Sequence, residues 1–280
     1  MIMNKLSIDK KVKIISALVE GNSIRATCRI TGAAKGTVIR LLESVGKACS
    51  KYQNEHLRNL NCRNIQIDEI WSFCYAKQKN VPDNKQGKFG YGDVWTFTAI
   101  DADTKLVPSW LVGLRDAGYA FEFVNDLKDR LANRVQITTN GHKIYLDAVE
   151  GAFGLAVDYA MLVKLYGNEP DKEEKRYSSP ECIATDIRIM QGKPNPKLIS
   201  TSYVERQNLT MRMSMRRFTR LTNAFSKKIE NLEYAVALHF MYYNFACVHK
   251  SLSNPYHRTP AMAAGIENHI WTIEEIVKLI

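Results

Sequence analysis

The chain has 280 residues, of which 45% are hydrophobic and 24% charged, and this is the composition of a folded protein with ample material for a core. Its apolar runs are too short to cross a membrane and its first residues lack the apolar segment of a signal peptide, so we expect a cytoplasmic chain without membrane contacts. The six cysteines are scattered without metal-ligand spacing, which favours reduced thiols over a structural zinc site.

The net charge of +10 is unevenly distributed along the chain. Residues 1–60 contain eleven Lys and Arg against four Asp and Glu, and residues 201–230 contain seven against two. Two basic blocks suggest two contact surfaces for a polyanion such as nucleic acid. Two solvated helix faces would give the same pattern, and composition alone does not separate the two interpretations.

The first 50 residues predict helices over 8–19, 24–30 and about 34–49. Ser23 is a candidate N-cap for the second helix, and Gly32 lies in the turn that follows it. Two helices joined by a Gly-containing turn are typical of a helix-turn-helix, although a helical hairpin that only packs on its neighbours would look similar. The adjoining positive charge favours DNA binding. The predicted DNA contacts of this segment, with the last three facing the major groove, are Arg25, Arg29, Lys35, Thr37 and Arg40.

After a polar segment at 51–63, the spacing of the apolar residues changes from that of helices to the two-residue alternation of strands. Strands are expected over 65–76, 94–101, 106–112, 135–139 and 159–166, and helices over 119–133 and 145–153. An irregular insertion near 167–200, a long helix from about 203 and an apolar helix over 232–248 complete the chain. Three antiparallel strands followed by alternating helices and strands are the element order of the RNase H fold.

The sequence therefore predicts an α/β protein built around an RNase H-like mixed sheet. The expected division is a helix-turn-helix domain at 1–50, a linker at 51–63, a catalytic domain at 64–230 and a C-terminal helical segment at 231–280.

An acidic residue stands inside the first predicted strand. Cleavage and transfer of phosphodiesters need divalent metals, and carboxylates hold them. Asp68 lies among Ile67, Ile70 and Trp71, where an acid is costly unless it has a partner or a metal. Its neighbour Glu69 should point to the opposite face, so only one of the two acids can belong to a site. The position in the fold favours Asp68 as the acid that belongs to the site. The alternative is that Asp68 is an ordinary acid on an edge strand, facing solvent.

Position 140 ends the predicted strand that lies beside the first strand in this fold, so its side chain should meet Asp68. A metal ligand is expected there, yet the residue is Asn140, which keeps one carbonyl oxygen and lacks the charge. Ordinary turn chemistry is the alternative for an Asn-Gly pair, because both residues tolerate left-handed backbone.

Glu205 lies one turn into the long predicted helix. Thr201 or Ser202 could cap that helix and Glu205 could complete a capping box, which is the alternative to a role as a metal ligand. A row of basic residues follows on the same helix and suits phosphate contacts. These residues are Arg212, Arg216, Arg217 and Arg220.

These residues lie in long segments that resemble bacterial insertion-sequence transposases of the IS-one family. The segments are IQIDEIWSFCYAKQKNVP, GYGDVWTFTAIDADTKLVPSWLVG, QITTNGHKIYLDAVEGAF and STSYVERQNLTMRMSMRRFTRLTNAFSKK, and the tail HFMYYNFACVHKSL with TPAMAAG is typical of transposase C-termini. The resemblance covers nearly the whole chain from about residue 5.

The resemblance implies a catalytic triad of two aspartates and a glutamate, carried onto Asp68, position 140 and Glu205, with Arg212 as the basic residue that follows. It implies a two-metal Mg²⁺ site, with Mn²⁺ as a substitute, and DNA cleavage and strand transfer. The implied partners are double-stranded DNA, namely terminal inverted repeats and target DNA, and at least one further copy of the chain. A bacterial, nucleoid-associated protein is expected.

The chain departs from the family pattern at two points. The cysteine zinc finger with which many members begin is absent, and the family's aspartate is replaced by Asn140. An inactivating substitution made to trap a DNA complex, or decay of a natural copy, would each produce that change. We therefore expect a transposase that binds DNA and cleaves it poorly.

Two other functions stay open at this point. A catalytically dead DNA-binding regulator would explain Asn140 but not the retained Asp68 and Glu205. A nuclease of the RNase H or resolvase type is the third hypothesis, with Glu122 as an extra carboxylate. His249 is a weaker candidate for a residue beside the site, since a lone His after a buried helix is more often structural.

Overall fold

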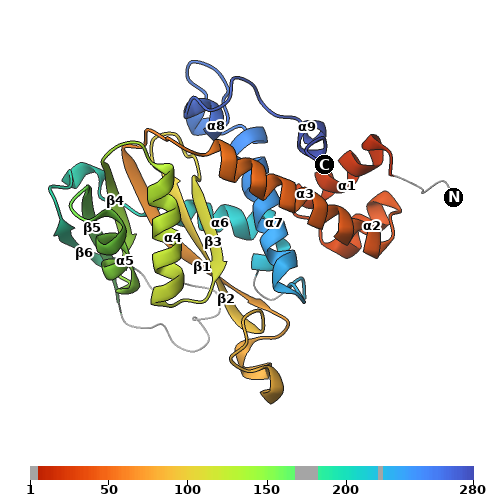
Figure 1. Cartoon of the computed structure of the whole chain (residues 1–280), viewed down its shortest axis with the longest axis horizontal. Helices are drawn as coiled ribbons and strands as arrows, with labels where there is room; N and C mark the ends of the chain where they lie inside the picture. The colour runs from red at the N-terminus through yellow and green to blue at the C-terminus, as the bar shows by residue number, and fades with distance from the viewer. Residues whose placement is uncertain (1–5, 168–181, 220–222) are drawn as a thin grey trace.

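The computed structural model describes residues 6–167, 182–219 and 223–280, and a six-stranded mixed sheet lies at the centre of this described part (Figure 1). The strands follow the spatial order β3-β2-β1-β4-β5-β6. Their bounds are Asn64–Cys74 (β1), Gly92–Asp101 (β2), Ser109–Gly113 (β3), Val135–Asn140 (β4), Val157–Tyr166 (β5) and Cys182–Gln191 (β6). Neighbouring strands among β1, β2 and β3 are antiparallel, β4 and β5 run parallel to β1, and β6 is antiparallel to β5. The expected α/β class and mixed sheet are confirmed.

Helices cover both faces of the sheet. Helices α4 (Ala117–Arg130) and α5 (Ile144–Phe153) cover one face, and α6 (Ser202–Ser214) lies on the other (Figure 1). Phe97 of β2 contacts Phe123 of α4 and Tyr145 of α5, with ring centroids 5.7 and 6.3 Å apart. Because β1 is central and covered on both faces, its side chains are buried in a nearly continuous run.

The N-terminal helices are α1 (Ile8–Val19), α2 (Ile24–Thr31) and α3 (Lys35–His56). The predicted N-cap Ser23 accepts a hydrogen bond from the backbone N–H of Ala26, and Gly32 ends α2 in the left-handed region. Helix α3 packs on α7 (Ile229–Met241) at very close range, because a Cβ on Gly46 would lie 2.5 Å from Cβ of Tyr234. The three predicted N-terminal helices are confirmed, and their role in DNA binding stays a prediction.

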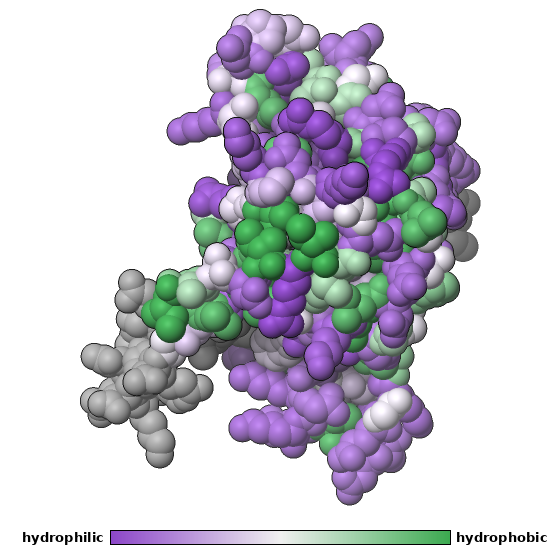
Figure 2. Space-filling view, turned by 90° about the vertical axis from the view of Figure 1, so that its left-hand side faces the viewer, coloured by the Kyte–Doolittle hydropathy of each residue, from purple (hydrophilic) through white to green (hydrophobic). Residues whose placement is uncertain are grey.

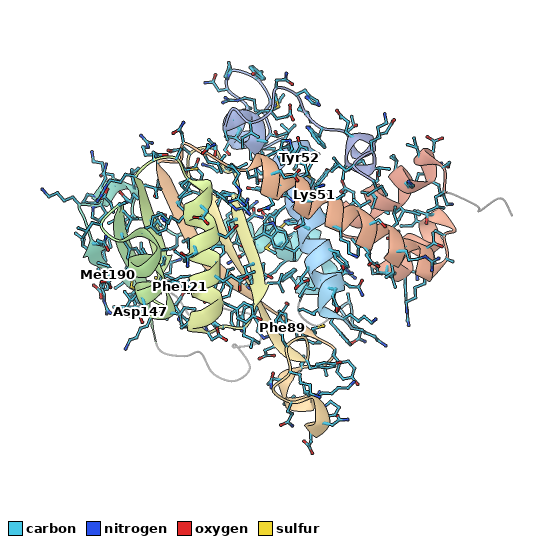
Figure 3. The ribbon with its side chains drawn as sticks, viewed as in Figure 1. Lys51, Tyr52, Phe89, Phe121, Asp147 and Met190 are labelled. Carbon is cyan, nitrogen blue, oxygen red and sulfur yellow. The ribbon has the colours of Figure 1, made fainter. Side chains whose placement is uncertain are left out.

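The buried side chains form one continuous cluster that runs from Ile14 in α1 to Ile276 in α9 (Ile273–Val277). Figure 3 labels Tyr52 near the C-terminal end of α3, where its ring contacts Phe245 and Trp271 with centroids 5.5 and 4.9 Å away. The C-terminal segment, which also includes α8 (Pro260–Ala263), therefore packs on the N-terminal helices. No helix of the described part combines the length and apolar composition needed to cross a bilayer.

The structure corrects the expected course of three segments. Helix α3 continues to His56, so the first part of the segment expected as a linker is helical. Strand β6 lies in the segment expected to be irregular, whereas residues 168–181 of that segment lie outside the described residues. The expected apolar helix over 232–248 is α7 followed by a π-helical turn at Tyr242–Ala246.

Helix α6 is shorter than expected and does not carry the whole row of arginines. Met215 is buried with extended backbone (φ −129°, ψ 106°), which ends the helix, and a 3-10 turn follows at Arg216–Phe218. Arg212 lies on α6 and Arg216 and Arg217 on the 3-10 turn, whereas Arg220 lies outside the described residues.

Candidate active site and nucleic-acid interface

The ends of two adjacent parallel strands bring Asp68 and Asn140 together. In the parallel β1–β4 pairing Ile67 lies opposite Thr139. The next residues of the two strands, Asp68 and Asn140, therefore also lie opposite each other. The Asn140 Nδ2 group donates a hydrogen bond to Asp68 Oδ1 at 2.6 Å. The predicted neighbourhood of the two positions is observed, while their catalytic roles stay predictions.

The orientation of the Asn140 amide is set by its backbone neighbours. Its Oδ1 accepts a hydrogen bond from the His142 N–H at 3.0 Å, and because that N–H can only donate, Nδ2 must face Asp68. Neither Asn140 nor Gly141 has a positive φ, so left-handed turn chemistry does not explain the pair. Gly141 is required by close packing instead, since a Cβ there would lie 2.9 Å from Cγ2 of Val163.

Both carboxylate oxygens of Asp68 are occupied by amide donors. Asn208, one turn after Glu205 on α6, donates from Nδ2 to Asp68 Oδ2 at 2.8 Å. Burial, together with the charge of Glu69, raises the pKa of Asp68 to about 7 from its ordinary value of 3.8, even though the bond from Asn140 favours the ionised form. Asn208 was not predicted from the sequence.

Glu69 points to the opposite face of β1 but still reaches the strand end. Its carboxylate accepts hydrogen bonds from Arg115 Nε at 2.8 Å and from the Tyr145 hydroxyl at 2.6 Å, and its side chain is 1% exposed. Its Oε2 also lies 3.5 Å from Asn140 Nδ2. The expectation that only one of the two acids belongs to the site is corrected, because Asn140 at the end of β4 contacts both.

Helix α6 is capped by a strand residue. The Gln66 Oε1 atom on β1 accepts hydrogen bonds from the backbone N–H groups of Tyr203 and Val204, at 2.8 and 3.2 Å. The N-cap residue Thr201 makes no capping bond with its side chain, so the capping-box alternative for Glu205 is not observed. Gln66 and Asp68 lie on the same face of β1, so this cap and the Asn208 bond together fix α6 over the strand.

Glu205 is held by a cation that the sequence did not indicate. Lys164 of β5 approaches both of its carboxylate oxygens, at 2.5 and 2.6 Å, and the Thr201 hydroxyl donates to Oε1 at 2.7 Å. Glu205 lies close enough to Asp68 for its charge to add to the raised pKa of that carboxyl.

The side chains of Asp68, Asn140 and Glu205, in the arrangement observed, do not fit a divalent metal ion. Amide N–H groups face both oxygens of Asp68, Lys164 neutralises Glu205, and Asn140 directs its donor rather than its oxygen toward Asp68. Within the part of the chain that the structure describes, no three His, Cys, Asp or Glu side chains converge to hold a metal ion.

The two basic blocks of the sequence meet at one cavity of about 670 Å³. It lies between the turn that joins α1 to α2 and the segment that follows α6, where Gly21 (φ +77°) approaches the backbone of Ser214 so closely that a Cβ would lie 3.1 Å from its carbonyl oxygen. No Asp or Glu is among the described residues that line it. Its basic lining residues are Arg25, Lys35, Arg216, Arg217 and Lys227. Two cations of the first basic block and three of the second therefore line one cavity, and contact of either block with a polyanion stays a prediction.

Arg217 is the most deeply placed of these cations. Its Nε donates to the Ser226 hydroxyl at 2.8 Å, and burial lowers the pKa of its guanidinium to about 10. In the described part of the chain no carboxylate forms an ion pair with it. A guanidinium in this position suits a phosphate group, whose oxygens would restore the missing countercharge.

The remaining predicted residues lie elsewhere. Arg29 and Arg40 are exposed and Thr37 is half-buried, and none of them lines the cavity. Glu122 lines a separate cavity of about 280 Å³ beside Arg130, so it does not supply an extra carboxylate to Asp68. His249 packs edge-to-face on Tyr243, with ring centroids 4.5 Å apart, which agrees with a structural role.

Comparisons with known proteins leave the family open. No family model matches the sequence, and no curated protein matches it. The chain is similar to a crystal structure of a pre-cleavage Mos1 transpososome, with a TM-score of 0.27, 10% identity and coverage of 86% of this chain and 79% of that one. It is also similar to the Mos1 strand transfer complex, with a TM-score of 0.25, 12% identity and coverage of 86% and 77%. TM-scores this low do not establish a shared fold.

Proposed function

We propose that this chain is a DNA transposase with an acidic triad, able to bind DNA but deficient in cleavage because position 140 is an asparagine. The observation that carries the proposal is the contact of Asp68 with Asn140 at two parallel strand ends, beneath the helix that carries Glu205 and contacts Asp68 through Asn208. Restoring aspartate at position 140 would create the three-carboxylate set that Mg²⁺, or Mn²⁺ in its place, needs for phosphodiester chemistry.

The topology supports an RNase H-like catalytic core. The spatial order is β3-β2-β1-β4-β5, with three antiparallel strands followed by two parallel ones, and β4 lies beside β1 as expected for that fold. The resemblance to IS-one family transposases adds the expected substrate, which is the terminal inverted repeats of an element. At least two copies are needed to bring two ends together.

The basic cavity supports binding of a DNA backbone. Arg25 and Lys35 come from the predicted helix-turn-helix, and Arg216 and Arg217 follow Glu205, so one phosphate strand could contact both groups. In this proposal α3 lies in the major groove of a terminal repeat, and the arginines after α6 hold the backbone beside the acidic site.

A cleavage assay tests the proposal. The probe is duplex DNA from either side of the coding sequence, incubated in Mg²⁺ with the parent chain, with Asn140→Asp and with Asn140→Asp combined with Asp68→Ala. We expect Asn140→Asp to raise cleavage about 100-fold or more, and the added Asp68→Ala to abolish the gain. No gain on reversion, together with no effect of Asp68→Ala, would mean that the triad is wrongly assigned.

The competing function is a DNA-binding regulator with a catalytically dead core. The observation in its favour is that Asn140, Asn208 and Lys164 together satisfy the acidic side chains without a metal. Specific binding of the same duplex by both the parent and Asn140→Asp, with cleavage by neither, would favour the regulator.

A further inference from the structure

Strand β6 is an edge strand with both faces exposed. Eight of its ten residues are exposed, and Ile183, Ile187 and Ile189 are 67%, 47% and 60% exposed. Figure 3 labels Met190 at the outer margin of the molecule, and Figure 2, which looks at this side, shows hydrophobic residues gathered near the middle of the face. Natural edge strands are usually protected by lysine, proline or a covering segment, because their free backbone groups can pair with another strand. No described residue pairs with the outer edge of β6.

The charges of β6 are self-complementary. Asp186 and Arg188 are its only charged residues, and they lie on one face with Arg188 Nε 2.7 Å from Asp186 Oδ2. Two copies of the strand related by a two-fold axis can pair only antiparallel. Each pair of opposed residues in an antiparallel ladder is either hydrogen-bonded or non-hydrogen-bonded, and the two residues of a pair are of the same kind. Each residue therefore lies opposite its own copy in the partner subunit, or opposite a residue an even number of positions away in the sequence.

This rule leaves few registers near the centre of the strand. Placing Asp186 opposite its own copy sets acid against acid, and placing Arg188 opposite its own copy sets base against base. The register with Ile187 on the two-fold axis places Asp186 opposite Arg188 of the partner subunit. The symmetry repeats this contact with the two copies exchanged, so the register contains two opposite-charge pairs. The same register sets Ile187 against its own copy, and Thr185 against Ile189 of the partner subunit.

We propose that two copies of the chain associate through antiparallel pairing of their β6 strands with Ile187 on the two-fold axis. The two sheets become one continuous sheet, and the exposed Ile187 side chains of the two copies cover each other across the new strand pair. The partner is a second copy because the charge pattern complements itself. The inference rests on the proposed function, which requires at least a dimer, and specifies how the two copies associate. Its test needs no DNA, so failure of the strand pairing can be distinguished from failure of the proposed DNA transposase activity.

Charge reversal tests the register. In analytical ultracentrifugation at one ionic strength we expect the parent to dimerise and Asp186→Arg to raise the dissociation constant by about tenfold or more, because it creates two like-charge pairs. Adding Arg188→Asp restores the opposite charges and the parent affinity. Asp103→Arg, which breaks the exposed Arg63 ion pair far from β6, is the matched control and leaves the dimer unchanged. A monomeric parent, or a double variant as weak as the single one, overturns the proposal.

Cysteine cross-linking tests the position of the axis. In a Cys182→Ser background, which removes the exposed native thiol of the strand, Ile187→Cys should form a disulfide-linked dimer on mild oxidation. Opposed residues of an antiparallel pair have Cα atoms about 4.5–5.5 Å apart, within the range that a disulfide spans. In Thr185→Cys the two thiols lie four residues, about 13 Å, apart along the strands and should not bond. Cross-linking of both variants at equal rates overturns the register.

Discussion

Asn140 supplies a neutral hydrogen-bond donor to the acidic site. Its amide donates to Asp68 at 2.6 Å and its oxygen is fixed by the His142 N–H, so the side chain cannot turn over without losing a bond. A carboxylate in the same place would set two oxygens against each other at that distance, and they would need a proton or a metal between them. The asparagine therefore stabilises the chain in the absence of metal.

An aspartate at this position should make the stability of the chain depend on metal. We expect Asn140→Asp to lower the free energy of unfolding by about 1–3 kcal/mol in EDTA, because a buried hydrogen bond becomes a contact between two acids. Addition of Mg²⁺ should recover the loss, measured by urea unfolding with and without the metal. Asn125→Asp, an asparagine on α4 whose amide bonds only the Phe121 carbonyl, is the matched control and should not respond to Mg²⁺. An equal response of both variants would contradict the expectation.

Asp68 should make stability fall as pH rises. Burial raises its pKa to about 7 in the folded chain, above the ordinary 3.8, so its contribution is full below about pH 4 and is lost as the pH rises through 7. Between pH 4 and pH 8 the free energy of unfolding should fall by about 2–4 kcal/mol more in the parent than in Asp68→Asn. Denaturant unfolding at both pH values measures the difference, and parallel pH profiles would show that Asp68 does not titrate in this range.

Sequence predicted the acidic positions but not their partners. Asp68 was recognisable because an acid inside an apolar strand needs an explanation, and the element order placed position 140 beside it. Lys164 and Asn208 had no such signal, since each looks like an ordinary polar residue until the sheet and α6 bring it to Glu205 or Asp68. Glu69 was assigned to the other face correctly, but strand alternation does not say how far a side chain at a strand end can reach.

At the scale of elements, α6 depends on β1 for its N-terminal cap. The first turn of a helix has free N–H groups, and the fully buried Gln66 satisfies two of them. The helix carries Glu205 one turn later, so a residue 139 positions earlier in the chain positions the third acid.

Removal of this cap should destabilise the chain. We expect Gln66→Met to lower the free energy of unfolding by about 1–2 kcal/mol, the usual cost of losing an N-cap. Gln207→Met is the matched control, because Gln207 is also a buried glutamine but its side-chain amide makes only a long contact, 3.5 Å from Nε2 of His239, among the described residues. Urea unfolding compares the two variants, and a Gln207→Met loss as large as that of Gln66→Met would contradict a capping role.

Strand β6 and the end of α6 were not predicted from the sequence, for different reasons. Strand β6 shows alternating isoleucines at 183, 187 and 189, but the polar composition of the surrounding 34 residues concealed a ten-residue strand. The end of α6 was missed because Met215 fits a helix as well as a strand by propensity, and only its burial in extended backbone ends the helix.

At the scale of the whole molecule, the fold brings together cations that are about 180 residues apart in the sequence. Lys35 at the start of α3 and Arg217 after α6 line the same cavity because the turn at Gly21 packs against the end of α6. The summed charge suggested that each block contacts a polyanion, but no local pattern in the sequence predicts that cations of both blocks line the same cavity.

Salt dependence of DNA binding tests the shared cavity. We expect Lys35→Ala to weaken binding of duplex DNA and to reduce the magnitude of the salt slope by about 1, because one phosphate contact is lost. Lys51→Ala is the matched control: Figure 3 labels Lys51 near the other end of α3, about 24 Å along the helix, where its exposed side chain lies 4.0 Å from Glu55. Fluorescence anisotropy over a salt series gives both slopes, and equal losses in the two variants would indicate unspecific attraction instead.

The identity of residue 140 also has a genetic consequence. Asparagine and aspartate codons differ only in their first base, adenine in one and guanine in the other. A single transition in the gene therefore converts the metal-independent contact between Asn140 and Asp68 into a pair of acids. Under the proposed function, a growing population of cells would continually generate rare revertants in which the element moves again, and a mobility assay would detect them as late, clonal events.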